Sequence, residues 1–164
     1  MVQAGREITN ARWDELYRER FPTVYRALVA TLRDAEAARD ALQDAFAEGL
    51  RRPPTRDDNL TGWLFRVALR HARHSPFRPA WERLTDVSAA PALDDEIARV
   101  LDRIEVGALL ARLTTRQRAM VVAQYYLGLD QAEIARAFGV RPGTVRATIS
   151  QSLARMRKGA ADGS

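Results

Sequence analysis

The segment from Leu127 to Lys158 constrains the fold of this chain most, because it has the order helix, glycine-containing turn, helix. Asp130 can cap the first helix, and Glu133 three residues later completes an approximate capping box. Gly139 can adopt the positive φ that ends this helix, and Pro142 suits the first turn of the next one. The segment is therefore predicted to be a helix-turn-helix, a motif whose usual partner is the DNA major groove.

Apolar side chains recur with helical spacing in both predicted helices. The inward positions are Ile134, Ala135 and Phe138 on the first helix, and Val145, Ile149, Leu153 and Met156 on the second. The opposite face of the second helix is therefore free to meet a ligand. The stretch from Ile134 through Ala161 holds no acidic residue but contains Arg136, Arg141, Arg146, Arg155, Arg157 and Lys158. Such a segment attracts phosphates, although an ordinary αα-hairpin with a solvated basic face has the same pattern.

Composition excludes several classes of function. The chain of 164 residues is 46% hydrophobic, which allows one core of ordinary size or two small ones. It has no cysteine, so a disulfide scaffold, a thiolate metal site and a cysteine nucleophile are all ruled out. His71 and His74 lack a nearby carboxylate motif, so a surface or phosphate-facing pair is expected rather than a zinc site. No metal, cofactor or enzyme activity is predicted, because no Gly-rich phosphate loop or paired catalytic constellation is present.

Charge and hydropathy point to a polyanionic partner rather than a membrane. No apolar run approaches the roughly 20 residues that span a bilayer, and the N-terminal segment is polar, so a cytoplasmic protein without membrane insertion is expected. The formal net charge is +5. The two ends of the chain are basic and flank an acidic middle at residues 81–112, a distribution that favours nucleic acid as the partner of the ends.

Helical periodicity dominates the first 76 residues. Apolar positions from Trp13 to Leu32 predict a first helix, in which Pro22 is an interruption that can split or restart it. A second helix is expected from Asp34 or Ala35 to Leu50. Its inward positions are Ala38, Leu42, Ala45, Phe46 and Leu50. After a break that contains Pro53 and Pro54, a third helix is capped by Asn59 or Thr61. Its apolar face is formed by Leu60, Trp63, Leu64, Val67 and Ala68, and its basic face by Arg66, Arg70, Arg73 and His74.

These patterns predict an all-α chain of two small helical domains joined by a flexible linker, the second ending in the helix-turn-helix. The first domain is expected at 10–76, because its three helices can share a core. Residues 77–94 have the composition of a linker, and the second domain is expected at 95–159. In the second domain periodicity resumes at 96–111, and a helix that begins at Thr114 or Thr115 is expected to bury Met120, Val121, Tyr125 and Tyr126.

Motifs in both predicted domains match a known family in order and spacing. Residues 13–17 (WDELY), 34–36 (DAE), 40–46 (DALQDAF) and 62–68 (GWLFRVA) look like successive parts of sigma region 2. Residues 113–118 (LTTRQR), 126–129 (YLGL), 132–135 (AEIA) and 143–146 (GTVR) look like region 4. From about Trp13 to Lys158 the chain thus resembles bacterial sigma factors of the extracytoplasmic-function (ECF) group.

The resemblance implies a role in transcription initiation without covalent chemistry. A sigma factor binds core RNA polymerase, directs it to a promoter and helps to open the duplex, and an anti-sigma factor is a further partner compatible with the family. The resemblance places six residues at the −35 element: Arg141, Thr144, Arg146, Ala147, Ser150 and Gln151. Those at the −10 element are Asn59, Arg66, Arg70, Arg73 and His74, with the loop from Pro53 to Asn59 holding a flipped base. Asp40, Gln43 and Asp44 correspond to the contact with core polymerase.

Two other functions agree with parts of the sequence. A sigma-like adaptor would bind polymerase but would not need Arg146. A one-component helix-turn-helix repressor or activator would dimerise on a palindromic operator, and would leave the pattern from Asp40 to Phe46 unexplained. The chain also has Thr148 and Gln151 where family members commonly carry basic residues, so its promoter sequence does not follow from the resemblance.

Overall fold

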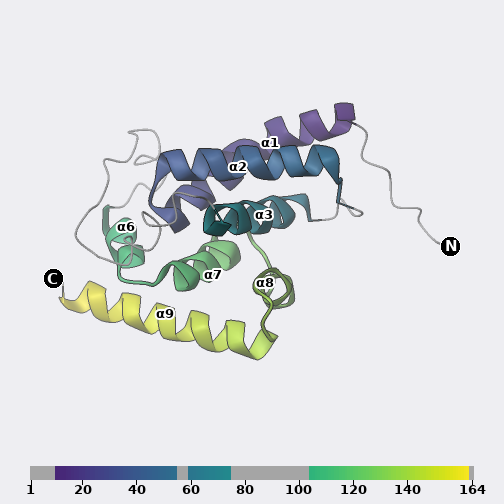
Figure 1. Cartoon of the computed structure of the whole chain (residues 1–164). Helices are drawn as coiled ribbons and strands as arrows, with labels where there is room; N and C mark the ends of the chain where they lie inside the picture. Colours follow the sequence, from purple (N-terminus) through teal and green to yellow (C-terminus); the bar gives the residue numbers. More distant parts are fainter. Residues whose placement is uncertain (1–9, 55–58, 75–103, 163–164) are drawn as a thin grey trace.

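The computed structural model describes residues 10–54, 59–74 and 104–162. These ranges contain α1 (Asn10–Leu32), α2 (Ala35–Arg51), α3 (Leu60–His74), α6 (Ile104–Ala111), α7 (Thr115–Tyr125), α8 (Gln131–Phe138) and α9 (Pro142–Asp162), and no strand. The all-α prediction is confirmed for this part of the chain. The predicted linker at 77–94 lies outside the described residues, as do residues 55–58 of the predicted −10 loop. In Figure 1, α1 and α2 lie at the top, α3 beneath them, α7 and α8 lower still, and α9 along the bottom.

Helix α1 continues through Pro22, where an interruption was predicted. A proline in a helix interior removes one backbone donor, and its ring crowds the carbonyl one turn earlier. Side chains on both sides of Pro22 contribute to one core, because Leu16, Val24 and Leu28 are all buried. The helix therefore neither splits nor restarts, since burial of one long apolar face outweighs the local cost of the proline.

Helix α2 begins where the sequence predicted it. Asp34 is the N-cap, and its Oδ1 accepts a hydrogen bond from the backbone N–H of Ala37 at 2.9 Å. The prediction for Leu50 is wrong, because this side chain is 41% exposed. The inward position of the last turn is Gly49, where a Cβ would lie only 1.9 Å from Cζ2 of Trp13. Leu50 is turned by about 100° from that position and therefore points toward solvent.

Trp13 is the centre of the packing among α1, α2 and α3. Its side chain is only 2% exposed, and its Nε1 donates to the carbonyl oxygen of Phe46 at 3.2 Å. The Phe46 ring stacks on the indole at a centroid distance of 5.7 Å, and the Trp63 ring meets it edge-on at 5.6 Å. One large aromatic side chain from each helix therefore fixes how the three helices lie together. We call α1 to α3 the N-terminal helical group.

Helices α6 to α9 form the C-terminal helical group. The predicted start of α7 is confirmed, because Thr114 and Gln117 make a reciprocal capping box with bonds of 3.1 and 3.2 Å. Met120 and Val121 are buried as predicted, but Tyr125 and Tyr126 are 61% and 44% exposed, so their predicted burial is wrong. The inward positions after α7 are taken by Leu127 and Leu129 beyond the helix end, with Gly128 in the left-handed region between them.

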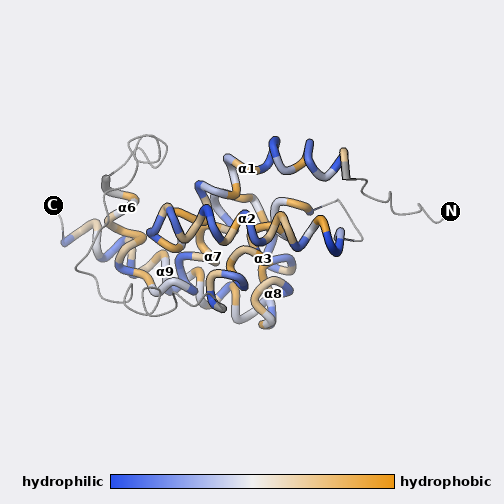
Figure 2. The backbone as a smooth tube through the Cα atoms, turned by 45° about the horizontal axis from the view of Figure 1, so that its top comes forward, coloured by the Kyte–Doolittle hydropathy of each residue, from blue (hydrophilic) through white to orange (hydrophobic). Residues whose placement is uncertain are grey.

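The two helical groups pack against each other, which the sequence did not predict. Helix α1 contacts α7, and α3 contacts α8. One continuous cluster of buried apolar residues extends from Trp13 in α1 to Ile149 in α9, and a small separate cluster forms around Leu110, Leu113 and Val121. In Figure 2, hydrophobic and hydrophilic residues alternate along helices in both groups, as expected where each helix has one face in a shared interior. We call this packing of the two groups the closed arrangement.

Arg118 joins the two groups from a buried position, with only 1% of its surface exposed. Its guanidinium donates to Thr31 O at 2.9 Å, Leu113 O at 2.9 Å, Leu110 O at 3.4 Å and Thr115 Oγ1 at 3.3 Å. None of these acceptors is a carboxylate. Burial, together with the nearby charge of Arg33, lowers the pKa of Arg118 to about 10. Because Thr31 O lies in the last turn of α1, the cation satisfies a carbonyl at the negative end of that helix.

Candidate nucleic-acid interface

Helices α8 and α9 form the predicted helix-turn-helix. The capping box is confirmed, because the N–H of Glu133 donates to Asp130 Oδ1 and the N–H of Asp130 donates to Glu133 Oε2, both at 2.8 Å. Gly139 ends α8 at φ 63°, in the left-handed region that glycine adopts without strain. Pro142 is the first residue of α9. The local sequence therefore fixes both ends of the turn that orients α9.

The residues predicted to meet the −35 element lie on the outer face of α9 or, for Arg141, directly before its first residue. All six of them, Arg141, Thr144, Arg146, Ala147, Ser150 and Gln151, are exposed. On the opposite face Val145 and Ile149 are buried against the rest of the C-terminal group. Helix α9 also forms the outermost layer in Figure 1, so this exposed face is turned away from the other described helices. The geometry that a major-groove contact requires is present.

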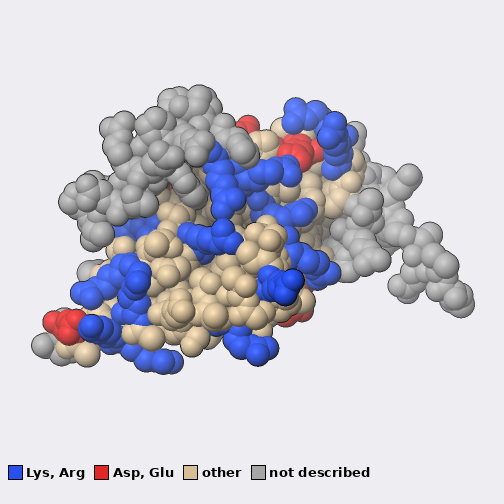
Figure 3. Space-filling model, turned by 60° about the horizontal axis from the view of Figure 1, so that its bottom comes forward, with Lys and Arg blue, Asp and Glu red and all other residues tan. Residues whose placement is uncertain are grey.

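Basic side chains dominate the face of the molecule near α9. Figure 3 views the molecule from this side, and Lys and Arg side chains surround an uncharged central area there, with few acidic groups. The exposed basic residues of α8 and α9 include Arg136, Arg155 and Lys158, and Arg141 is exposed directly before α9. A surface of one sign attracts a polyanion, and the phosphate backbone of DNA is the strongest natural example.

Four of the five residues predicted to meet the −10 element lie on α3 but differ in their surroundings, and Asn59 directly precedes this helix. Arg66 and Arg73 are exposed, whereas Arg70 forms an ion pair with Glu48 of α2. His71 Nε2 lies 2.7 Å from the other oxygen of Glu48. The hydrogen bond from Arg70 is the main cause that lowers the pKa of Glu48, although partial burial opposes it. Sequence reasoning missed Glu48, because no motif links it to α3; the side chain of His74 lies outside the described atoms.

Asn59 has two roles in the structure, and only one of them was predicted. Its Oδ1 accepts from the N–H of Gly62 at 3.1 Å, which confirms Asn59 as the N-cap of α3. Its Nδ2 donates to Glu133 Oε1 at 2.5 Å. Glu133 belongs to the capping box of α8, so this bond connects the predicted −10 surface to the helix-turn-helix. No local pattern in the sequence indicates this contact, because the two residues lie 74 positions apart.

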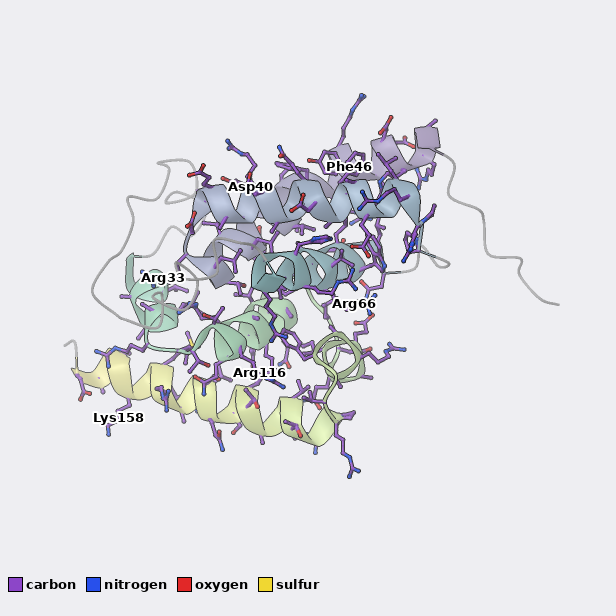
Figure 4. All side chains as sticks on the ribbon, in the orientation of Figure 1. Arg33, Asp40, Phe46, Arg66, Arg116 and Lys158 are labelled. Carbon is purple, nitrogen blue, oxygen red and sulfur yellow. The ribbon has the colours of Figure 1, made fainter. Side chains whose placement is uncertain are left out.

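The predicted polymerase contact lies on a different face from the two predicted DNA contacts. Asp40, Gln43 and Asp44 are all exposed on α2, while Ala41 and Leu42 between them are buried. Asp40 is labelled on α2 in Figure 4, at the opposite side of the molecule from α9. A protein surface could therefore bind α2 without covering the outer face of α9.

Residues 10–54, 59–74 and 104–162 contain no group of three or more His, Asp or Glu side chains placed to hold a metal ion. None of the helices in these three ranges has both the length and the apolar character needed to cross a membrane.

The fold and the exposed face of α9 define a helical protein with a DNA-binding helix-turn-helix. Its residues 103–156 match the family model for sigma-70 region 4. ECF RNA polymerase sigma factor SigM of Mycobacterium tuberculosis is 34% identical over 155 residues, which cover 89% of this chain and 76% of SigM. SigL of the same species is 29% identical over 87% of this chain and 85% of SigL, and the RNA polymerase sigma-E factor of Streptomyces coelicolor is 28% identical over 89% and 84%. The chain belongs to the ECF RNA polymerase sigma factors.

Proposed function

We propose that this chain directs core RNA polymerase to promoters by reading the −35 element with α9 and the −10 element with α3. The observation that carries the proposal is the exposure of all six predicted −35 residues. Five of them lie on the outer face of α9 and Arg141 directly precedes that helix, after a turn defined by the capping box of α8 and by Gly139. Because the chain belongs to the ECF RNA polymerase sigma factors, the process in which such a helix takes part is transcription initiation. Proteins of this family are not enzymes in general, so the chain contributes recognition rather than bond chemistry.

Each proposed contact follows from side-chain chemistry. Arg146 is the best candidate for direct readout, since an arginine bidentate to guanine contributes about 1 to 3 kcal/mol of discrimination. Arg66 and Arg73, which form no ion pair among the described residues, provide positive charge for the backbone of the −10 element. Asp40 and Asp44 present carboxylates to the polymerase. The proposed partners are core RNA polymerase and promoter DNA, with an anti-sigma factor as a further partner. These partners are found in the cytoplasm, which is therefore the proposed location of the chain.

The closed arrangement is incompatible with simultaneous contact to both promoter elements. Positions −10 and −35 are about 25 base pairs apart, or about 85 Å of B-DNA at about 3.4 Å per pair. Helix α1, the longest in the described residues with 23 residues, spans only about 35 Å. Because α3 packs against α8, the two helical groups must separate before α3 and α9 can occupy the two elements. We propose that core polymerase stabilises this separated form.

In vitro transcription with purified core polymerase and a genomic promoter library tests the proposal. Promoter-specific transcripts are expected, and Arg146→Ala should reduce them by about 5- to 150-fold, since a loss of about 1 to 3 kcal/mol is involved. Arg18→Ala removes the same charge from an exposed position of α1, outside the proposed DNA contacts, and is the matched control. Polymerase binding without transcripts would favour the adaptor, and a dimer on palindromic DNA without polymerase would favour the repressor.

A further inference from the structure

A pocket of about 260 Å³ lies between the N-terminal and C-terminal helical groups. Arg66, Arg70 and Arg73 line it from α3, and Arg116 lines it from α7. Figure 4 labels Arg66 and Arg116, which mark the two sides. We call it the arginine pocket. Because its walls come from both helical groups, it exists only in the closed arrangement.

The rest of the pocket wall is mainly apolar. Leu69 and Ala119 are buried at 8% and 2% exposure, and the half-buried ring of Phe138 lies beside them. A low-dielectric wall beneath several charges of one sign focuses the electric field into the cavity. Electrostatic attraction for an anion is therefore stronger here than over an open surface with the same arginines.

Most of the positive charge around the pocket is uncompensated. Arg70 has Glu48 as its ion-pair partner. In contrast, Arg66, Arg73 and Arg116 form no ion pair with any residue that the structure describes. Three such guanidinium groups around one small cavity repel each other, and a bound anion would relieve this repulsion.

We propose that the arginine pocket binds a small oligophosphate anion, either free or as the phosphate arm of a nucleotide. Guanidinium groups bind phosphate oxygens in bidentate geometry, and several arginines can share the adjacent phosphates of one chain. A ligand held by Arg116 on one side and by Arg66 and Arg73 on the other bridges the two helical groups. It therefore stabilises the closed arrangement.

This binding has a consequence for DNA recognition that rests on the proposed function. Arg66 and Arg73 belong to the surface proposed to contact the −10 element. A phosphate ligand that occupies them competes with the promoter and also opposes the separation of the helical groups. Binding itself depends on the pocket alone, so it is measured without DNA or polymerase, and its failure is distinguishable from failure of the proposed function.

Calorimetric titration of the full chain tests the site, with tripolyphosphate, ATP and orthophosphate as probes at about 0.15 M ionic strength. Saturable one-to-one binding of tripolyphosphate is expected. Arg116→Ala and, from the opposite wall, Arg73→Ala should each weaken it by about tenfold or more, because each removes one charge-assisted contact. Arg136→Ala removes the same charge from an exposed position of α8 outside the pocket, and should change the affinity by less than about twofold.

The probes separate the two sources of the ligand. Tighter binding of ATP than of tripolyphosphate identifies a nucleotide, whereas the reverse order identifies free oligophosphate. Circular dichroism and thermal unfolding establish that each variant is folded, as expected for exposed arginines. The absence of saturable binding by every probe would overturn the proposal. Equal weakening by Arg116→Ala and Arg136→Ala would also overturn it, since diffuse surface charge would then explain the affinity.

Discussion

The hydrogen bond between Asn59 and Glu133 offers a direct way to change the balance between the closed and separated arrangements. Asn59→Asp retains the N-cap of α3, because aspartate caps a helix about as well as asparagine. It replaces the Nδ2 donor, 2.5 Å from Glu133 Oε1, by a second carboxylate. Two like charges about 4 Å apart repel by about 4 kcal/mol at an effective dielectric constant of about 20, and by about 1 kcal/mol in water. Since both side chains are half-buried, the expected cost is about 2 to 4 kcal/mol.

A second substitution restores the hydrogen bond, with the donor now at position 133 and the acceptor at position 59. In Glu133→Gln the single amide oxygen can accept from the N–H of Asp130, but Asn59 then loses its acceptor. In the double variant Asn59→Asp, Glu133→Gln, the glutamine oxygen still serves Asp130 and the amide nitrogen donates to the new carboxylate at position 59. The double variant should therefore recover most of the closed population. The coupling energy of this cycle is expected to reach at least about 1 kcal/mol.

Energy transfer between two dyes measures the outcome. The chain has no cysteine, so Glu36→Cys on α2 and Arg155→Cys on α9 label only these two exposed positions. The cost of about 2 to 4 kcal/mol shifts the equilibrium by about 30- to 1000-fold toward separation, so transfer efficiency should fall in Asn59→Asp and recover in the double variant. Unchanged transfer in Asn59→Asp would refute the reasoning, because the contact would then have no role in holding the helical groups together.

Three further predictions concern stability. Gly49→Ala should lower the free energy of unfolding in urea titrations by about 1 to 2 kcal/mol, because the clash with Trp13 outweighs the better helix propensity of alanine. The control Gly143→Ala should not destabilise the protein, since a Cβ at that position meets nothing within 4 Å. Asp130→Ala should cost about 1 kcal/mol by removing the N-cap of α8, while a change as large in the exposed control Glu19→Ala would argue against a capping effect. The lowered pKa of Glu48 gives stability above pH 4.5 that is lost as the pH falls through the folded-state pKa. The thermal unfolding temperature of Glu48→Gln should therefore depend less on pH in that range than that of the unsubstituted protein. Equal acid sensitivity of the variant and the unsubstituted protein would contradict this role of Glu48.

Local rules made much of the fold predictable. Asp34, Thr114 and Asp130 were expected at or beside helix starts, and each of them caps a helix. Gly139 was expected to end α8 with positive φ, and it does. These predictions succeeded because a cap depends on residues within one turn of it. Burial at helix ends was predicted less well, since Leu50 and Tyr125 face solvent where Gly49 and Leu129 fill the interior.

Contacts between the two helical groups were not predictable in the same way. The bonds of Asn59 to Glu133 and of Arg118 to Thr31 join residues 74 and 87 positions apart. Hydrophobic periodicity shows which face of a helix is apolar, but it does not show which other helix covers that face. An arginine such as Arg118 also reads as a surface residue in sequence, because arginine is rarely buried fully. The proposed promoter-contacting residues were reached through family motifs, and their roles remain predictions.

The helical groups pack together in the free protein and are proposed to separate on the polymerase. The most direct measurement is the energy transfer between labels at positions 36 and 155, recorded for the free protein, with core polymerase, and with polymerase and promoter DNA. High transfer is predicted for the free protein and low transfer in both complexes, as expected for contacts about 85 Å apart along the DNA. Transfer that stays high in a complex that is making promoter-specific transcripts would contradict the proposed separation.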